Sequence, residues 1–219
     1  GAGVQTIVYD PSAVSTEITS YADLWDTSLQ SSIGITSNFR VMNGMALKIA
    51  GESYNTEDIA TIEQAGEKLL ELAPNIRLIK DDNLQVDLLS GEVSAAVMYT
   101  SQVTQACMEN PDLQVVYPSE GIGFGIMAQF IPANAPNKDA AYAFIDYILR
   151  PEVSKQCYEY IGYYCTNQAA DELIEEEYKP FLTLPEDFSG NMEMIQNISA
   201  EAEETHVQIW TEFRAACGQ

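Results

Sequence analysis

The feature that most constrains the fold is a run of almost entirely apolar residues at positions 93–99, preceded by the turn signal Ser90-Gly91. A strand that is apolar on both faces is buried on both faces, as in a parallel sheet that helices cover from either side. Alternation, β-branched residues and turn residues predict several further strands. These strands are residues 4–9, 32–36, 76–79, 113–117 and 124–131.

Helical patterns occupy the intervals between the predicted strands. Asn38 is placed to cap the helix that follows it, and Gly51 is placed to end that helix. Ser20 is expected to cap a short helix in which Asp23 completes a capping-box pattern. The predicted helices are residues 20–25, 38–51, 56–73, 82–91, 101–108, 137–149, 151–160 and 172–178, with one or two more in 192–217. This alternation predicts an α/β fold with helices on both faces of the sheet.

The charge balance argues against nucleic acid as a partner. The chain has 33 acidic and 10 basic residues and a net charge of -23, whereas phosphate binding requires a basic face. No apolar run approaches the roughly 18 residues of a membrane span, and the first residues lack a signal-peptide pattern, which indicates a mature or trimmed chain. We expect a soluble protein that works among cations or outside the cell, with most acids, such as the run 175–177, on solvated helical surface.

Four cysteines leave the redox state open. Cys157 and Cys165 are close enough in sequence to form a disulfide, in which case Cys107 and Cys217 form the second pair. Four free, buried thiols are the alternative, because connectivity does not follow from spacing. No Cys-x-x-Cys motif occurs and His206 is the only histidine, so no metal site is expected.

Catalytic motifs are not found. The alternating glycines of residues 121–125 precede a strand, which is the wrong context for a dinucleotide-binding loop. A carboxylate pair that uses Glu92 or Asp82 has no support from the sequence. We therefore expect no enzyme activity and no cofactor.

An ordered set of segments resembles the spermidine/putrescine-binding proteins, which belong to the extracellular solute-binding proteins of ABC importers. The segments are SYADLWD at 20–26, SGEV at 90–93, IPANAPNKDAA at 131–141, FIDYILRPEV at 144–153 and YIGY at 160–163. Together they cover nearly the whole chain. The resemblance implies an α/β fold of the type II periplasmic-binding-protein kind, in which two lobes close on a small solute and dock on ABC permease subunits. It also implies an extracytoplasmic location, periplasmic or at the cell surface, through an anchor or a fused permease.

Compared with that family, the chain lacks the segment that precedes Val4, so lobe two is expected nearly complete with only part of lobe one. Residues 1–11 correspond to a hinge strand, 12–122 to lobe two, 123–170 to a second hinge strand and a lobe-one-like helical segment, and 171–219 to C-terminal helices on lobe two. The lobe-one-like segment is expected to fold onto lobe two or to pair with another copy of the chain, which makes self-association a further expectation.

The resemblance places the solute at the ends of strands where helices begin. The expected ligand-binding residues are Asn38, Phe39, Arg40, Tyr99, Thr100, Ser101, Met127 and Tyr163. Carboxylates with which the family holds ammonium groups are replaced here by 37–41 and Met127. This replacement favours a neutral or anionic small molecule over a polyamine, because Asn38, Thr100 and Ser101 with helix N-terminal amides suit carboxylate or phosphate oxygens.

Structural roles remain open for the same residues. Asn38 is first a helix cap, Arg40 can form a salt bridge within the lobe, and Tyr99 or Met127 can belong to the core. A ligand-sensing or interaction module without transport is the alternative function on the same fold. Gene neighbours that encode an ATPase and permeases would favour the importer.

Overall fold

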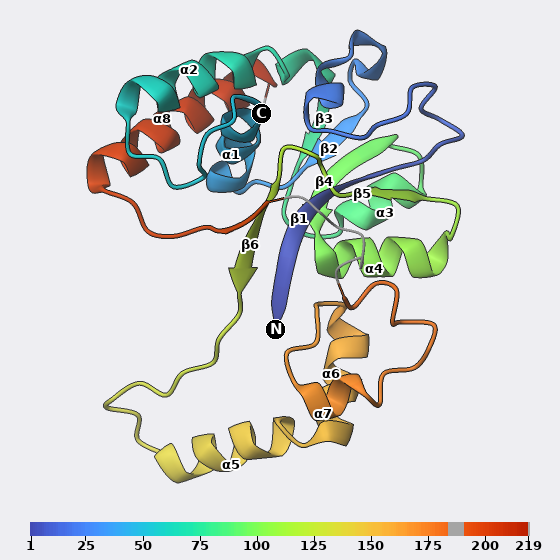
Figure 1. Ribbon diagram of the computed structural model, residues 1–219, viewed down its shortest axis with the longest axis vertical. Coiled ribbons are helices and arrows are strands. Elements are labelled where there is room, and N and C mark those ends of the chain that lie inside the picture. Colours follow the sequence, from blue (N-terminus) through green and yellow to red (C-terminus); the bar gives the residue numbers. More distant parts are fainter. Residues whose placement is uncertain (184–190, 219) are drawn as a thin grey trace.

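The computed structural model describes residues 1–183 and 191–218, and its centre is a mixed sheet (Figure 1). The strand order is β3-β2-β4-β1-β6-β7, and β5 also pairs with β1. The strands are β1 (Ala2–Tyr9), β2 (Ile33–Ile35), β3 (Ile76–Ile79), β4 (Ala95–Tyr99), β5 (Gln114–Val116), β6 (Ile122–Ile126) and β7 (Met192–Met194). The apolar β4 is buried as predicted, but it runs parallel only to β2 and is antiparallel to β1.

Helices cover both faces of this sheet, as the alternation predicts. Neighbouring residues of β1 point to opposite layers: Ile7 packs in the larger core with α1, α2 and α8, whereas Val8 packs in the smaller core with α3 and α4. The helices of the larger core are α1 (Phe39–Ile49), α2 (Ile59–Leu70) and α8 (Ala200–Ala216). Those of the smaller core are α3 (Leu84–Leu89) and α4 (Thr100–Glu109), and short 3-10 turns lie at Ala22–Trp25, Thr27–Leu29 and Ala73–Asn75.

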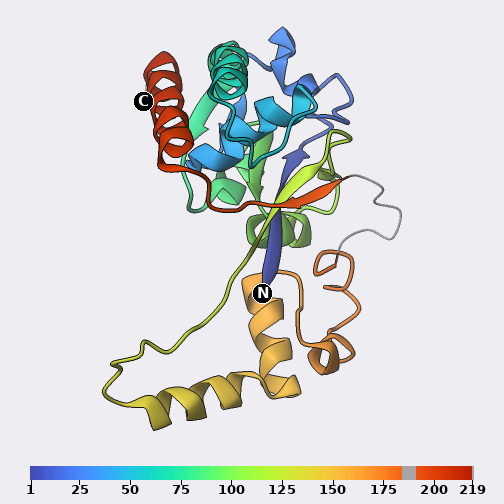
Figure 2. The same cartoon turned by 60° about the vertical axis from the view of Figure 1, so that its left-hand side comes forward.

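A helical extension leaves the sheet after β6. An irregular run leads to α5 (Lys138–Ile148), which is followed by α6 (Pro151–Ile161) and the short α7 (Gln168–Asp171). In both views α5 lies well away from the sheet, beyond α6 (Figures 1 and 2). No residue of α5 is buried, so this helix does not fold onto the sheet, which was one of the two arrangements expected for the segment.

Strands that depend on distant partners differ most from the predictions. The strand predicted at 124–131 is β6, which begins at Ile122 and ends at Ile126, where its last partner is Ala2 of β1. The predicted closing helices begin instead with β7, because Met192–Met194 pairs in parallel with the free edge of β6. The part of this region at 184–190 lies outside the described residues.

Helix starts also differ where another cap is available. The first turn begins after Tyr21 and has no side-chain cap, so the prediction that Ser20 caps it is wrong. Asp23 does accept hydrogen bonds from the backbone amides of Ser20 and Thr19, as expected for the second residue of a capping box. Helix α2 begins after Asp58, whose side chain caps it, rather than at Thr56.

The prediction of a helix at 172–178 is also wrong. Asn167 caps α7, which ends at Asp171, and the acidic run 175–177 lies in turns. The polypeptide therefore continues in turns and bends after α7 instead of extending a helix.

All four cysteines are unpaired, as in the free-thiol alternative, but only Cys107 is buried and the other three are partly exposed. Burial raises the pKa of the Cys107 and Cys217 thiols to about 11, which keeps both protonated at neutral pH. No helix in the described ranges is long and apolar enough to cross a lipid bilayer.

Candidate functional site

The ends of β2 and β4 lie side by side and form the centre of the candidate site. Ile35 pairs with Val97; α4 follows β4 directly, and three residues separate β2 from α1. Asn38 caps α1 by accepting from the Arg40 amide (3.0 Å), and its own side-chain amide donates to the Tyr99 hydroxyl (3.3 Å). The prediction that Asn38 caps this helix is confirmed, and the same side chain links the ends of the two strands.

A carboxylate that was not among the predicted residues completes this edge. Asp81 follows β3, and its Oδ1 accepts from the Thr36 hydroxyl (2.8 Å) and from the Ser37 amide (3.0 Å), while Oδ2 accepts from the Ser37 hydroxyl. Its carbonyl oxygen accepts from Gln102 in the first turn of α4. We call Ser37, Asn38, Asp81, Tyr99, Thr100 and Ser101 the strand-end site.

The Asp81 carboxyl is held in its charged form. Partial burial alone would raise its pKa, but the hydrogen bonds from Ser37 and Thr36 outweigh that effect and the pKa lies below its ordinary value. The same bonds restrict the carboxylate to one orientation. The strand-end site thus contains a negative charge of fixed orientation, and Tyr99 provides an aromatic ring in the same site.

Tyr163 approaches this site from the helical extension. Its ring lies so close to Gly3 that a Cβ at that position would be 2.4 Å from Cδ1 of Tyr163 and 3.3 Å from the Thr100 hydroxyl. Gly162 has a φ of +81° and packs on Ser101. Glycine is therefore required at both positions to bring Tyr163 against the first turn of α4.

Thr100 uses its hydroxyl within the protein. The hydroxyl donates to the Val4 carbonyl (3.0 Å) and accepts from the Val4 amide (2.9 Å), which joins the start of α4 to β1. Thr100 also lines a cavity of about 380 Å³ with Val103, Tyr117 and Tyr164. Thr100 is the one predicted ligand-binding residue that lines this cavity. The cavity is therefore separate from Asn38 and Tyr99.

Met127 lies just beyond β6, beside the first residue of the chain. Its amide donates to the Gly1 carbonyl (2.8 Å), and half of its side chain is exposed. A Cβ on Gly1 would touch both the Met127 methyl group and Tyr163. Six of the eight predicted residues therefore gather around the start of β1 and the ends of β2 and β4.

The other two predicted residues point elsewhere. Phe39 packs against the larger core. The Arg40 guanidinium donates to the carbonyl oxygens of Tyr54 (2.9 Å) and Gln196 (3.1 Å) and to the side chain of Asn55 (3.2 Å). Partial burial lowers its pKa, and its positive charge is directed to this polar cluster rather than to Tyr99.

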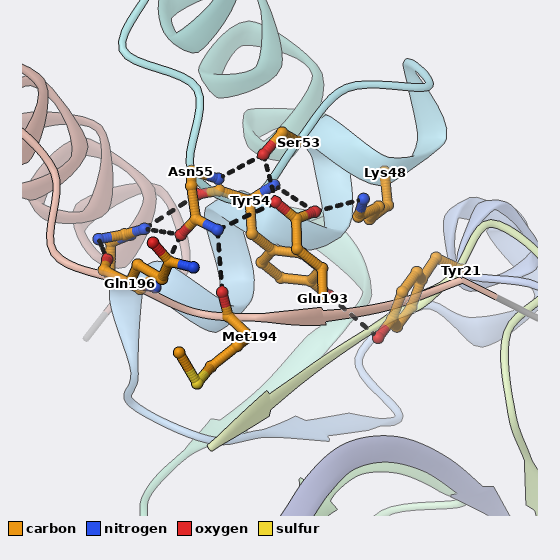
Figure 3. Close-up of polar contacts among 9 residues, drawn as sticks. Tyr21, Lys48, Ser53, Tyr54, Asn55, Glu193, Met194 and Gln196 are labelled. Atoms are coloured by element: carbon orange, nitrogen blue, oxygen red, sulfur yellow. Dashed lines mark hydrogen bonds and ion pairs between the residues drawn. The ribbon is translucent and has the colours of Figure 1, made fainter. Parts of the chain in front are cut away.

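Figure 3 shows the cluster, which is centred on Glu193 of β7. The Glu193 carboxylate binds Lys48 (2.7 Å), the Tyr54 amide (3.1 Å) and the side chains of Ser53 and Asn55. Burial would raise its pKa, but these partners lower it below the ordinary value. The cluster attaches β7 to the α1–α2 connection. The alternation of Met192–Met194 is the one sequence signal that could have identified it.

Metal binding has no geometric support in the part of the chain that is described. Within residues 1–183 and 191–218, no three His, Cys, Asp or Glu side chains are grouped to hold an ion. The strand-end site provides the aromatic ring of Tyr99, the amide of Asn38 and the carboxylate of Asp81, which are groups that bind a solute.

A family model matches most of this chain. The model is described as bacterial extracellular solute-binding protein and matches residues 1–182. The spermidine/putrescine-binding periplasmic protein of Salmonella typhimurium is 38% identical over 175 residues, which are 80% of this chain and 49% of that protein. The Escherichia coli protein of the same name is 37% identical over the same shares. The chain thus spans about half the length of the curated relatives that it matches.

Solved structures share the whole arrangement. A structure from Listeria monocytogenes has a TM-score of 0.89 at 25% identity, over 97% of this chain and 67% of that one. The spermidine/putrescine ABC transporter substrate-binding protein PotD of Streptococcus pneumoniae has a TM-score of 0.82 at 27% identity, over 99% of this chain and 68% of that one. The match includes the helical extension because it covers nearly every residue of this chain.

Proposed function

Because this chain belongs to the family of bacterial extracellular solute-binding proteins, we propose that it is part of the solute-capturing component of an ABC importer. The fold is that of the type II periplasmic binding proteins, as the sequence predicts. The proposed component works outside the cytoplasm, delivers its solute to permease subunits and does not alter the solute chemically.

One observation supports solute capture most directly. Asn38 and Tyr99, predicted residues from distant parts of the sequence, are bonded to each other where β2 and β4 end, and Tyr99 is half-buried there. Rings of this kind provide a broad contact for a solute, and Asn38 and Ser101 provide polar groups that orient it. The roles of Met127 and Tyr163 as ligand contacts remain part of this proposal.

The solute is proposed to be a polyamine. The curated relatives described above are named for spermidine and putrescine. The sequence-based preference for a neutral or anionic solute rested on the replaced carboxylates at 37–41 and Met127 and on the polar groups of Asn38, Thr100 and Ser101. In the structure another carboxylate, Asp81, is bonded to Ser37, the Thr100 hydroxyl is bonded to Val4, and the Arg40 guanidinium is bonded to Tyr54, Asn55 and Gln196. These contacts make spermidine and putrescine the first solutes to test.

Calorimetric titration of the polypeptide that carries this chain in the cell tests the proposal. Spermidine, putrescine, a neutral sugar alcohol and phosphate form the panel. We expect one solute to bind with a Kd in the micromolar range or tighter, and Tyr99→Ala to weaken it by about 10-fold or more because the ring contact is lost.

Tyr160→Ala is the matched control, since Tyr160 is 85% exposed on α6 and is outside the site. It is expected to bind like the wild type. Solute capture would be refuted if no member of the panel bound below about 1 mM. Stimulation of the cognate transporter ATPase by the loaded protein then tests delivery to the permease.

A further inference from the structure

We propose that Asp81 is the residue that selects for positive charge in the strand-end site, so that this site binds an organic ammonium group. The inference deepens the proposed function and rests on it. Its basis is the position, orientation and pairing of a carboxylate that the sequence alone did not place at the site. Each of these three properties is visible in the contacts of Asp81.

The first property is position. β3 pairs in parallel with β2, so the end of β3 lies beside the turn that precedes α1. Asp81 contacts Ser37, the neighbour of Asn38, and its carbonyl oxygen contacts Gln102 in the first turn of α4. The residue therefore lies between the starts of the two helices that carry the strand-end site, and it is exposed to solvent there.

The second property is orientation. Three hydrogen bonds from Thr36 and Ser37 restrict the carboxylate. A carboxylate offers about four acceptor positions, so about one remains for a solute. An ammonium group, which only donates hydrogen bonds, suits this remaining position, whereas a carboxylate or phosphate group would be repelled.

The third property is the absence of a neutralising partner. In the described part of the chain, no ion pair includes Asp81. The adjacent cation, Lys80, pairs with Asp87, and Arg40 is bonded to the Glu193 cluster. The negative charge of Asp81 is thus available in the same site as Tyr99, which is linked to it through Asn38 and Ser37 and whose ring face also attracts cations.

Asp81→Asn removes the negative charge and allows the hydrogen bonds of this side chain to remain. The amide oxygen can still accept from Thr36 and from the Ser37 amide, and the new amide nitrogen can donate to the Ser37 hydroxyl. Asp82→Asn is the matched control, because Asp82 is also exposed and adds the same change in net charge one residue further along. Asp81→Glu keeps the charge and tests rescue.

Three four-carbon probes differ only in their end groups: putrescine with two ammonium groups, butane-1,4-diol with hydroxyls and succinate with carboxylates. Calorimetry with each probe measures selection by charge. The wild type is expected to prefer putrescine, and Asp81→Asn is expected to weaken putrescine binding by about 10- to 100-fold, as for loss of a hydrogen bond to a charged group. Binding of the diol should not change, and Asp82→Asn should bind putrescine within about 2-fold of the wild type.

Rescue by Asp81→Glu would support a charge role even if Asp81→Asn lowered the melting temperature. Equal putrescine binding by the wild type and by Asp81→Asn would overturn the inference, and so would a preference of the wild type for succinate or the diol. In both cases the proposed function survives, because a solute is bound. A wild type that binds no probe and no member of the earlier panel would overturn the proposed function and the inference together.

Discussion

His206 is the only histidine of the chain and is fully buried between α1 and α8. Its Nδ1 contacts the side-chain amide of Asn43 (2.8 Å), and that amide also donates to the His206 carbonyl (3.0 Å). Burial, with a smaller contribution from the positive charge of Arg40, lowers the pKa of His206 to about 4. The folded protein therefore holds this imidazole neutral well into the acidic range.

This lowered pKa makes stability depend on pH. Between about pH 6.5 and 4 the unfolded chain binds a proton at His206 and the folded chain does not, so the free energy of unfolding falls as the pH falls, by up to about 3 kcal/mol. Urea unfolding across this range should show the slope, and His206→Gln should remove it. The single histidine signal in a proton NMR titration measures the pKa directly, and a midpoint near 6.5 would contradict the prediction.

Single residues also show why some site positions could not be predicted. Asn38 was identifiable because a cap depends on its immediate neighbours. Arg40 was not, since its acceptor on Gln196 is 156 positions away in the sequence. Asp81 reaches the site only because β3 pairs with β2, and that pairing is not visible in the residues around Asp81.

At the scale of elements, β7 depends on the ion pair between Glu193 and Lys48, because its row of backbone pairs with β6 is short. It has three residues and, within the described ranges, pairs with β6 alone, while Glu193 binds Lys48, whose side chain is 11% exposed. Glu193→Ala is expected to lower the free energy of unfolding by about 2 kcal/mol, because it leaves the Lys48 ammonium buried without a partner. Chemical denaturation measures this loss.

The Lys179–Glu176 pair is a matched control for this prediction. Its 2.6 Å separation is close to the 2.7 Å of Lys48–Glu193, but the Glu176 side chain is 89% exposed. Glu176→Ala should leave the stability unchanged, because water screens an exposed pair. Equal effects of the two substitutions would show that the Glu193 cluster does not anchor β7.

Elements were predicted well where they depend on local sequence and poorly where they depend on pairing. The helix after Asn38 and the strand Ile76–Ile79 agree with the predictions, because apolar spacing and turn residues define them. The end of β6 and the existence of β7 depend on strands far away in the sequence. The start of α2 shows a smaller effect, in which Asp58, two residues after the predicted Thr56, provides the cap.

For the whole molecule, the helical extension has an exposed apolar surface. The large apolar side chains of this surface are at least half exposed, and they are Phe130, Tyr142, Phe144, Tyr147 and Leu149. Exposed apolar surface of this kind promotes association in water. The 219-residue chain on its own is therefore expected to self-associate as its concentration rises.

Light scattering after size-exclusion chromatography measures this association. Replacing Phe144 and Tyr147 together by serine should shift the chain towards the monomer, because both side chains are more than half exposed on α5. Replacing the exposed Val86 and Val207 by serine gives the control, since both lie on other helices. A wild-type chain that remains monomeric at all concentrations would contradict the prediction.

The pair of hydrogen bonds between Thr100 and Val4 makes hydrogen exchange at the Val4 amide a measure of solute binding. An amide hydrogen exchanges with deuterated solvent when its hydrogen bond opens, and the Val4 amide is held by the first side chain of α4. The time for which the Val4 amide keeps its proton in deuterated solvent therefore records how stably the first turn of α4 is bonded to β1. A solute that settles beside Tyr99 would lengthen this lifetime, so its arrival can be timed without a dye or a substitution.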